Sequence, residues 1–306
     1  MQIQEGFFTD VDEYNEFVKN WDLTFNLLSK SDFSAQLKMI SSNDFSLLRE
    51  KLNGKIEQKG KTQQDFIVFG FGVNGTSFYW FDKKAGTNDL IIFPKENNFE
   101  VVSYNNHDVF VISIHKELFF NALKKVGASR SSTLFNGKSH KLFLSKAFSS
   151  KFTKLLDYFL NSNLNNKKKN EALIETVVST LIEYLYKADK NVQKVEKNKK
   201  VYAVKKAVKI INNQVDDIYS IKQLCAMVGV SEGTLLNAFK EKYKVTPSEY
   251  IKAFRLNKVK HEIYNTKGKA IFEIAGKYHF WHMGQFANDF KKQFGILPSE
   301  VGDKYD

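Results

Sequence analysis

Polar side chains recur at matching places in two segments of the C-terminal third. The segments read SEGTLLNAFK at 231–240 and WHMGQFANDFK at 281–291. On a helix, residues three or four apart share a face, so Leu235 and Phe239 would be buried while Asn237 points outward. Amide side chains can pair with adenine in the major groove, and lysine can bind phosphate. These residue types at this spacing predict contact with double-stranded DNA.

We expect the outward positions of both helices, with the residues that open them, to form the DNA-contacting set. The set is Ser231, Glu232, Gly233, Thr234, Leu236, Asn237, Lys240, Trp281, His282, Met283, Gln285, Asn288 and Lys291. Lys240 and Lys291 each follow a Phe that is predicted to be buried, which favours phosphate contact over base reading.

A shorter helix and a turn precede each of these two helices. In the first motif, Cys225 is small enough for close helix crossing, Gly229 allows a left-handed turn, and Ser231 can cap the following helix. The second motif repeats this layout with Ala275 and with His279, a residue that tolerates a positive φ only reluctantly. The pattern predicts two helix-turn-helix motifs.

A long helix of about residues 247–264 is predicted between the two motifs. Pro247 stands at its first position and Glu249 in its first turn, as helix N-termini favour. At 1.5 Å per residue it would be about 27 Å long, while equivalent faces of the major groove recur every ~34–36 Å. One chain could therefore place two recognition helices in successive grooves.

The other residues with reactive or ligating side chains form no recognisable site. Cys225 is the only cysteine and lies in an apolar helical row, which favours a buried packing thiol. None of the six histidines has a metal-ligand spacing. The segment GFGVNG at 70–75 lies between two predicted strands and opens no helix, so it indicates a hairpin turn. We predict no catalytic residues, no metal and no cofactor, and we class the protein as not an enzyme.

Composition agrees with a DNA-binding protein of two domains. The 306 residues exceed one ordinary core of about 100–200 residues. The net charge is +12, and residues 199–306 hold 19 Lys and Arg against 11 Asp and Glu, an excess that suits a polyanion. The single cysteine, the lack of a long apolar run and the acidic N-terminus predict a soluble, cytoplasmic protein with no membrane partner.

The N-terminal part changes from strand to helix patterns along its length. A short helix is predicted from Asp10 to Asn20, and a small barrel or sandwich over about 33–115. Its strands are predicted at 33–40, 45–52, 66–73, 77–81, 89–93, 99–103 and 109–114, with turns at Asn53-Gly54, Asn74-Gly75, Ala85-Gly86 and Asn105-Asn106. Helical periodicity follows at 116–126, 145–160 and 170–187.

The last of these helices carries an apolar row at four-residue spacing, Leu173, Val177, Leu181 and Leu185. The row is either intramolecular core or the seam of a dimer, and the pattern fits both.

The predicted domains are a sensing and dimerisation domain at 1–190, a linker at 191–200 and a DNA-binding domain at 201–306. The first contains the barrel at about 33–115 and helices at about 116–190. The linker has the polar, lysine-rich composition of a flexible connection.

Two stretches resemble the DNA-binding domain of AraC/XylS-family regulators and cover about a third of the chain. They read IKQLCAMVGVSEGTLLNAFKEKYKVTPSEYIKAFRLNKVK and AIFEIAGKYHFWHMGQFANDFKKQFGILPSEV. The pattern F-x-x-x-F-K-x-x-F-G-x-x-P-S at 286–299 follows a complete first motif, and HFWHMGQFANDF resembles the subgroup of ethanolamine-utilisation regulators. The family usually has Gly at His279 and often Arg at Asn237 and Asn288, so these departures concern the operator sequence.

The resemblance implies an α+β protein, with an N-terminal cupin-like β-barrel and flanking helices before an all-α domain with two helix-turn-helix motifs joined by a long helix. It implies a ligand-responsive activator that binds a DNA operator, a small-molecule effector and RNA polymerase, and we expect a homodimer. The aromatic residues expected to line the barrel are Phe66, Phe69, Phe71, Phe78, Trp80 and Phe93. The alternative is a regulator whose N-terminal domain only dimerises or binds a protein partner, without a ligand.

Overall fold

The computed structural model describes residues 1–28, 33–73, 75–81, 83–94, 98–125, 140–188, 199–214, 220–266 and 269–301. The chain divides into two compact units. Unit 1 contains Met1–Thr24, Ser34–Asn53 and Lys59–Lys194, and unit 2 contains Phe25–Phe33, Gly54–Gln58 and Val195–Asp306. Two short segments of the N-terminal half thus belong to the unit that holds the C-terminal helices. The predicted linker at 191–200 lies almost wholly outside the described residues.

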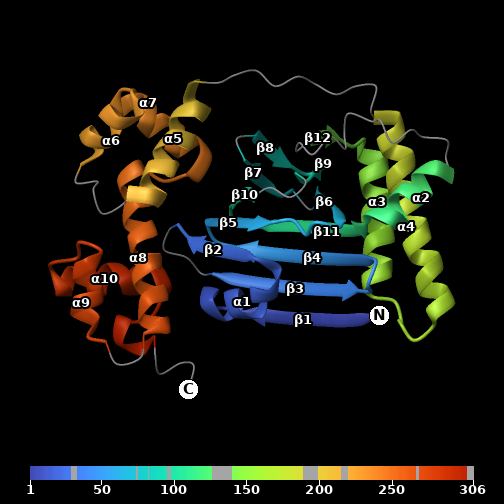
Figure 1. Ribbon diagram of the computed structural model, residues 1–306, viewed down its shortest axis with the longest axis horizontal. Coiled ribbons are helices and arrows are strands. Elements are labelled where there is room, and N and C mark those ends of the chain that lie inside the picture. Colours follow the sequence, from blue (N-terminus) through green and yellow to red (C-terminus); the bar gives the residue numbers. More distant parts are fainter. Residues whose placement is uncertain are drawn as a thin grey trace. The chain divides into compact units, whose positions relative to one another are not determined.

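Two β-sheets form the strand-rich part of the fold (Figure 1). The larger has seven strands in the order β1 (Gln2–Phe8), β3 (Ser34–Ser41), β4 (Phe45–Asn53), β11 (His107–His115), β6 (Phe66–Gly72), β9 (Asp89–Ile92) and β12 (His140–Phe143). The smaller has five, in the order β2 (Leu23–Leu27), β5 (Ile56–Lys61), β10 (Asn98–Ser103), β7 (Ser77–Trp80) and β8 (Lys83–Gly86). The predicted α+β fold class is confirmed.

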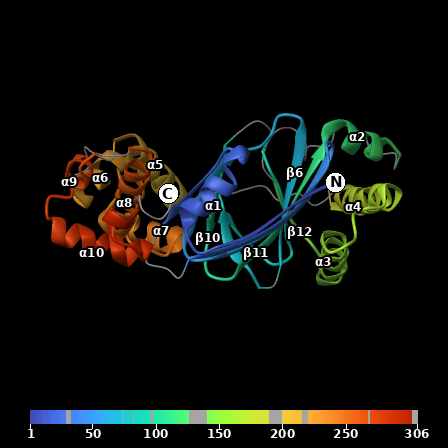
Figure 2. The ribbon, with the colours of Figure 1, turned by 90° about the horizontal axis from the view of Figure 1, so that it is seen from below.

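Helices cover one face of the seven-stranded sheet in unit 1 (Figure 2). They are α2 (Lys116–Lys125), α3 (Lys146–Leu160) and α4 (Lys167–Ala188), while the short α1 (Val11–Phe17) lies near β1 and β3. The side chains of α2, α3 and α4 pack with alternate residues of the strands, such as Phe69, Phe71 and Phe110, in one buried cluster. The Arg49 guanidinium on β4 adds a polar tie, because it binds Asp108 on β11 at 2.8 Å and also Asp157 on α3.

The apolar row of α4 belongs to this intramolecular cluster. Val177 and Leu181 are fully buried, Leu185 is 2% exposed, and Leu173 packs against them. Because the sheet and the neighbouring helices already cover these side chains, the row is core, and it is not a dimer seam.

Unit 2 contains the C-terminal helices, and its core is mostly aromatic and aliphatic. The helices are α5 (Lys199–Gln214), α6 (Ile221–Val228), α7 (Glu232–Tyr243), α8 (Pro247–Asn265), α9 (Ile271–Lys277) and α10 (Met283–Phe294). In Figure 1, α8 runs from the group of α5, α6 and α7 to the group of α9 and α10. This is the predicted arrangement of two motifs joined by a long helix.

Several local predictions differ from the structure. The strands β1, β2, β5, β8 and β12 were not predicted, and the turn expected at Ala85-Gly86 is the end of β8. Residues 70–75 do not close a hairpin: β6 pairs with β9 and β11, while β7 pairs with β8 and β10, so this turn passes from one sheet to the other. Within the described residues, no helix is long and apolar enough to span a membrane.

Candidate functional site

The first helix-turn-helix motif is formed by α6 and α7. The Ser220 hydroxyl accepts a hydrogen bond from Gln223 N at 3.1 Å and caps α6, which ends at Gly229 with φ 84°. The Val230 amide then donates to Cys225 O at 3.1 Å, and Ser231 caps α7 by accepting from Thr234 N at 3.3 Å. Cys225 is buried, as predicted, and burial raises the pKa of its thiol. The short turn therefore fixes the direction in which α7 leaves α6.

The second motif, α9 and α10, repeats this turn with different residues. The Phe280 amide donates to Ala275 O at 3.0 Å, which is the equivalent of the bond from Val230 to Cys225. His279 has a left-handed backbone with φ 65° at the position that corresponds to Gly229 in the first motif. A non-glycine residue in this region is strained. His282 precedes α10 without a side-chain cap bond.

The helix α8 is anchored to both motifs. A capping box of Thr246 and Glu249 opens it, with Glu249 N donating to Thr246 Oγ1 at 3.2 Å and Thr246 N donating to Glu249 Oε2 at 2.7 Å. Lys252 Nζ lies 3.2 Å from Asp289 Oδ1 on α10. Leu256 and Val259 share a core with Ile274, Ala275, Phe286 and Phe290. This packing positions the second motif on the far half of α8.

A carboxyl near the end of α8 gathers donors from the second motif. Glu262 accepts hydrogen bonds from Lys277 Nζ at 2.6 Å, Tyr278 OH at 2.8 Å and Lys269 Nζ at 3.2 Å. The hydrogen bond from Lys277, with those from Tyr278 and Lys269, lowers the pKa of Glu262 to about 2. Sequence reasoning missed this cluster, because Glu262 alone resembles an ordinary surface residue. The cluster also pairs the ammonium groups of Lys269 and Lys277 with a carboxylate.

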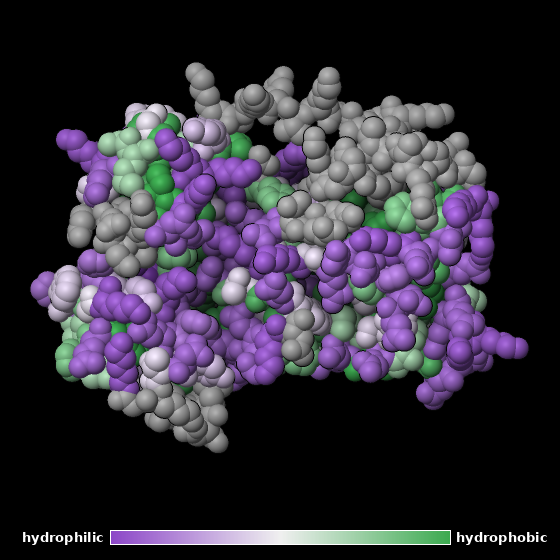
Figure 3. Space-filling model, viewed as in Figure 1, coloured by the Kyte–Doolittle hydropathy of each residue, from purple (hydrophilic) through white to green (hydrophobic). Residues whose placement is uncertain are grey.

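The predicted DNA-contacting residues lie on the surface of unit 2. On α7 and its cap, Ser231, Glu232, Gly233, Asn237 and Lys240 are exposed, while Thr234 and Leu236 are half-buried. At α10, Trp281 is 71% exposed and Met283 36%, and His282, Gln285, Asn288 and Lys291 are also exposed. Leu235, Ala238, Phe239, Phe286 and Phe290 face the core. Each helix therefore has a buried apolar stripe and an exposed face whose residues are mostly polar. Hydrophilic residues also dominate the coloured part of the molecular face drawn in Figure 3.

The structure places the predicted barrel-lining aromatics in separate surroundings. Phe69 and Phe71 contact Phe119 on α2 and Phe152 on α3, with ring centroids 5.8 Å apart in both pairs, so they face the helices. Phe66 lies edge-on to His115 at 5.5 Å.

The other three aromatics lie in a second buried cluster of unit 1. Phe78, Trp80 and Phe93 pack there with Phe99, and the Trp80 and Phe93 rings are 4.2 Å apart. Phe99 completes the group at 5.7 Å from Trp80 and 5.0 Å from Phe93. The six residues predicted to line a ligand site therefore lie in different parts of unit 1. In the second cluster, the rings of Trp80, Phe93 and Phe99 pack directly against one another.

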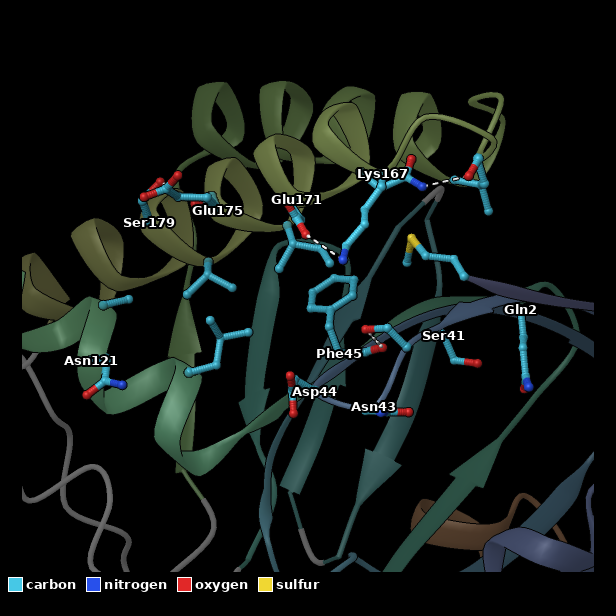
Figure 4. Close-up of a pocket in the computed structure, with 18 of the residues that line it drawn as sticks. Gln2, Ser41, Asn43, Asp44, Phe45, Asn121, Lys167, Glu171, Glu175 and Ser179 are labelled. Carbon is cyan, nitrogen blue, oxygen red and sulfur yellow. Dashed lines mark hydrogen bonds and ion pairs between the residues drawn. The ribbon is translucent and has the colours of Figure 1, made fainter.

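A groove in another part of unit 1 is large enough for a small molecule. It has a volume of about 1110 Å³ and is lined by the start of the chain, the turn after β3, α2 and α4. Figure 4 shows Phe45 between Lys167 and Glu171 of α4 on one side and Asn43 and Asp44 on the other. Two ion pairs, Lys125 with Glu175 at 3.1 Å and Lys167 with Glu171 at 3.9 Å, lie along it.

Asn170 lines this groove with an unpaired acceptor. The residue is 5% exposed, and its Nδ2 donates to Leu164 O at 2.7 Å. Its buried Oδ1 has no hydrogen-bond partner among the described residues. A buried acceptor without a hydrogen-bond partner lowers the stability of the fold. A ligand that donates a hydrogen bond to this oxygen would therefore bind favourably. Among the same residues, no group of three or more His, Cys, Asp or Glu is placed to hold a metal.

Comparison with known proteins identifies the C-terminal part of the chain. A family model described as a helix-turn-helix domain matches residues 224–304. A probable thc operon regulatory protein of Rhodococcus erythropolis is 29% identical over 99 residues, which are 32% of this chain and 30% of that protein. A XylDLEGF operon transcriptional activator 2 of Pseudomonas putida is 32% identical over 98 residues, which are 31% of this chain and 62% of that protein.

Among solved structures, the AraC-like transcriptional activator CuxR aligns with 85% of this chain and 96% of its own at 12% identity, with a TM-score of 0.43. The relatives above match only the last third of the chain, and the narrower resemblance to ethanolamine-utilisation regulators stays a prediction. The two motifs, the helix that joins them and the sequence relatives show that residues 224–304 carry a helix-turn-helix domain similar to the DNA-binding domain of AraC/XylS-family regulators.

Proposed function

We propose that the protein is a sequence-specific transcription regulator that reads a two-part DNA operator. The observation that carries this proposal is the pair of helices α7 and α10, which both turn a polar face outward while α8 connects them within one unit. With 19 residues, α8 is about 28 Å long. This length suits motifs that enter successive major grooves, which recur every ~34–36 Å.

Lys240 and Lys291 test whether both helices approach the phosphate backbone. Each is exposed and follows a buried Phe on its helix. Because each phosphate contact releases counterions, we expect Lys240→Ala and Lys291→Ala to weaken binding to all duplexes and to lower the salt slope by about one unit each. The measurement is the affinity of the full chain between low and moderate salt, for a duplex selected from a random pool and for a scrambled duplex.

Lys168→Ala supplies the matched control for these lysine changes. Lys168 is exposed on α4 in unit 1, so its loss removes one positive charge without changing a predicted DNA-contacting residue. An equal loss of salt dependence in Lys168→Ala would show that total charge matters and that Lys240 and Lys291 hold no particular phosphate.

We propose that the protein activates transcription, and the name of one relative supports this direction. The protein of Pseudomonas putida that shares the C-terminal third is named a transcriptional activator. We extend this role to the present chain, with RNA polymerase as its partner at the promoter. A reporter gene placed behind a selected operator should be transcribed more strongly when the full chain is expressed.

We further propose that the regulator responds to a small molecule, and that this effector binds in the groove of unit 1. Phe45, Leu118, Ile174 and Val178 give the groove an apolar surface, and Asn170 offers the unpaired acceptor. The ligand would be a small, largely apolar molecule with a hydrogen-bond donor. The cluster of Trp80 and Phe93 is the less favoured site, because its rings already pack against one another.

A thermal-shift screen of small metabolites tests the effector proposal, since a bound ligand raises the melting temperature with its concentration. We expect the shift given by an active compound to be lost in Asn170→Leu and kept in Phe78→Leu. The reverse result would place the ligand among the aromatics of the second cluster. A screen without any stabilising compound would favour the alternative, in which unit 1 only dimerises or binds a protein partner.

We retain a homodimer as part of the proposal. Its contact surface is not the row of Leu173, Val177, Leu181 and Leu185, because these side chains are core.

A further inference from the structure

Two strand segments from the N-terminal half are integral parts of unit 2. Phe25–Phe33 and Gly54–Gln58 contain the end of β2 and the beginning of β5. They are joined to each other, because Leu28 N donates to Lys55 O at 2.8 Å. Within unit 2 this strand pair contacts the helices of both helix-turn-helix motifs.

On the side of the first motif, the contact centres on Glu57. Its side chain is fully buried, and Oε1 accepts from Tyr250 OH at 2.8 Å and from Tyr243 OH at 3.5 Å. Oε2 accepts from Asn26 Nδ2 at 3.3 Å, which ties the two strand segments together at the same point. Tyr243 is the last residue of α7 and Tyr250 lies in the first turn of α8. A buried carboxyl group that loses its hydrogen-bond donors carries a large free-energy penalty. The bonds to Glu57 therefore hold the strand segment in one orientation against α7 and α8.

The end of α7 has a second tie to the same segment. Lys55 Nζ donates to the carbonyl oxygen of Lys244 at 3.0 Å. Lys244 is the C-cap of α7 and has φ 58°. The strand segment therefore binds the first recognition helix where its backbone carbonyl groups lack partners within the helix.

On the side of the second motif, the contact centres on the backbone of Leu27. Leu27 N donates to Asn257 Oδ1 at 3.2 Å, and Asn257 Nδ2 donates to Leu27 O at 2.8 Å. Gln293 Nε2 donates to the same Leu27 oxygen at 3.0 Å and to Ala253 O at 3.3 Å. Gln293 is buried and lies on α10, the second recognition helix.

We infer that residues 25–28 and 55–57 form a splint that fixes the two recognition helices relative to each other. The splint holds α7 through Glu57 and Lys55, and it holds α10 through the Leu27 carbonyl. Asn257 and Gln293 are positioning residues, because they face the strands and the core while the predicted base-reading residues face outward. The inference rests on the proposed two-part reading of DNA.

The splint matters for a two-part operator because binding of the second half-site is intramolecular. Its effective concentration depends on how well the second helix is held in place after the first has bound. A rigid pair of motifs favours one half-site spacing and rejects others. A loosened pair binds the correct spacing less tightly and tolerates a wrong one.

The experiment compares three duplexes bound by the full chain. The first is an operator that the wild-type chain selects from a random pool, the second has one base pair inserted between its half-sites, and the third has one half-site scrambled. We expect the wild-type chain to lose about tenfold in affinity on the insertion, which is the cost of about one misread base pair. In Asn257→Leu and Gln293→Met the loss should fall below about threefold, while binding to the single half-site stays within about twofold of wild type.

Asn265→Leu is the matched control, because Asn265 is an exposed amide on the same helix and its side chain bonds to His261 on that helix. It should keep the wild-type preference for the correct spacing. If circular dichroism shows Asn257→Leu to be unfolded, Gln293→Met decides, since methionine keeps the length of glutamine and removes its donors.

Two outcomes overturn different statements. Folded variants that keep the wild-type spacing preference overturn the splint and leave the proposed function standing. A wild-type chain that selects no duplex at all overturns the proposed function.

Discussion

Replacing Leu181 with glutamate will unfold unit 1. Leu181 is fully buried on α4 among residues of the seven-stranded sheet and the flanking helices. An unpaired charge at such a position, with the loss of the leucine contacts, costs more than about 4 kcal/mol, which is much of the stability of an ordinary domain. We expect a loss of cooperative melting in calorimetry and an aggregation-prone protein.

The same change on an exposed position of α4 gives the control. Ala172 is exposed about two and a half turns earlier on the same helix. Ala172→Glu should therefore shift stability by no more than about 0.5 kcal/mol. A Leu181→Glu protein that is folded, with unchanged melting and half the wild-type mass in light scattering, would contradict the core assignment and restore the dimer seam.

Removing the two exposed amides of the recognition helices will strongly weaken operator recognition while leaving general DNA binding in place. Asn237 on α7 and Gln285 on α10 are both exposed, next to buried stripes that fix their helices. A bidentate amide–adenine pair contributes about 1–3 kcal/mol of discrimination, so Asn237→Ala with Gln285→Ala should cost roughly 2–6 kcal/mol on the selected operator if the contacts add. The affinity for a scrambled duplex should stay nearly constant.

Asn163→Ala controls for the loss of an exposed amide, because Asn163 lies in unit 1 and outside the predicted interface. If the double variant binds the selected operator as the wild type does, neither helix can be oriented in the groove as proposed here. The comparison of selected and scrambled duplexes separates this result from a general loss of affinity.

The sequence predicts the helix-turn-helix motifs well because their signals are local. Gly229 gives the first motif its turn and Ser231 caps its second helix, and the structure uses both in that way. The same reasoning places Thr246 and Glu249 at the start of α8. Local chemistry of this kind can be read without knowing what lies across the core.

Two of the missed strands, β5 and β8, lack such local signals. β5 reads IEQKGK and β8 reads KKAG, so both are too polar for a search based on aromatic and β-branched runs. Glu57 stands among the polar residues of β5 and therefore resembles a solvent-facing residue. Its burial depends on Tyr250, which is 193 residues away in the chain, and no spacing rule reaches that far.

The ligand-lining prediction shows a different limit. Alternation separates the two faces of a strand but does not say which face lies under helices. Phe69 and Phe71 share a face of β6 that packs on helices, whereas Phe93 belongs to the other buried cluster. Aromatic residue type alone could not distinguish residues that pack under helices from residues of the other cluster.

The interleaved make-up of unit 2 constrains the order in which the chain can fold during synthesis. The bonds from Leu27 to Asn257 and to Gln293 join residues 230 and 266 positions apart. Long-range contacts of this kind form slowly, and N-terminal segments leave the ribosome long before their C-terminal partners exist. The ends of β2 and β5 must therefore wait without their final neighbours while about two hundred further residues are made. During that interval they expose an unfilled strand surface, which makes nascent chains of this protein candidates for chaperone binding and for exchange of these segments between two copies.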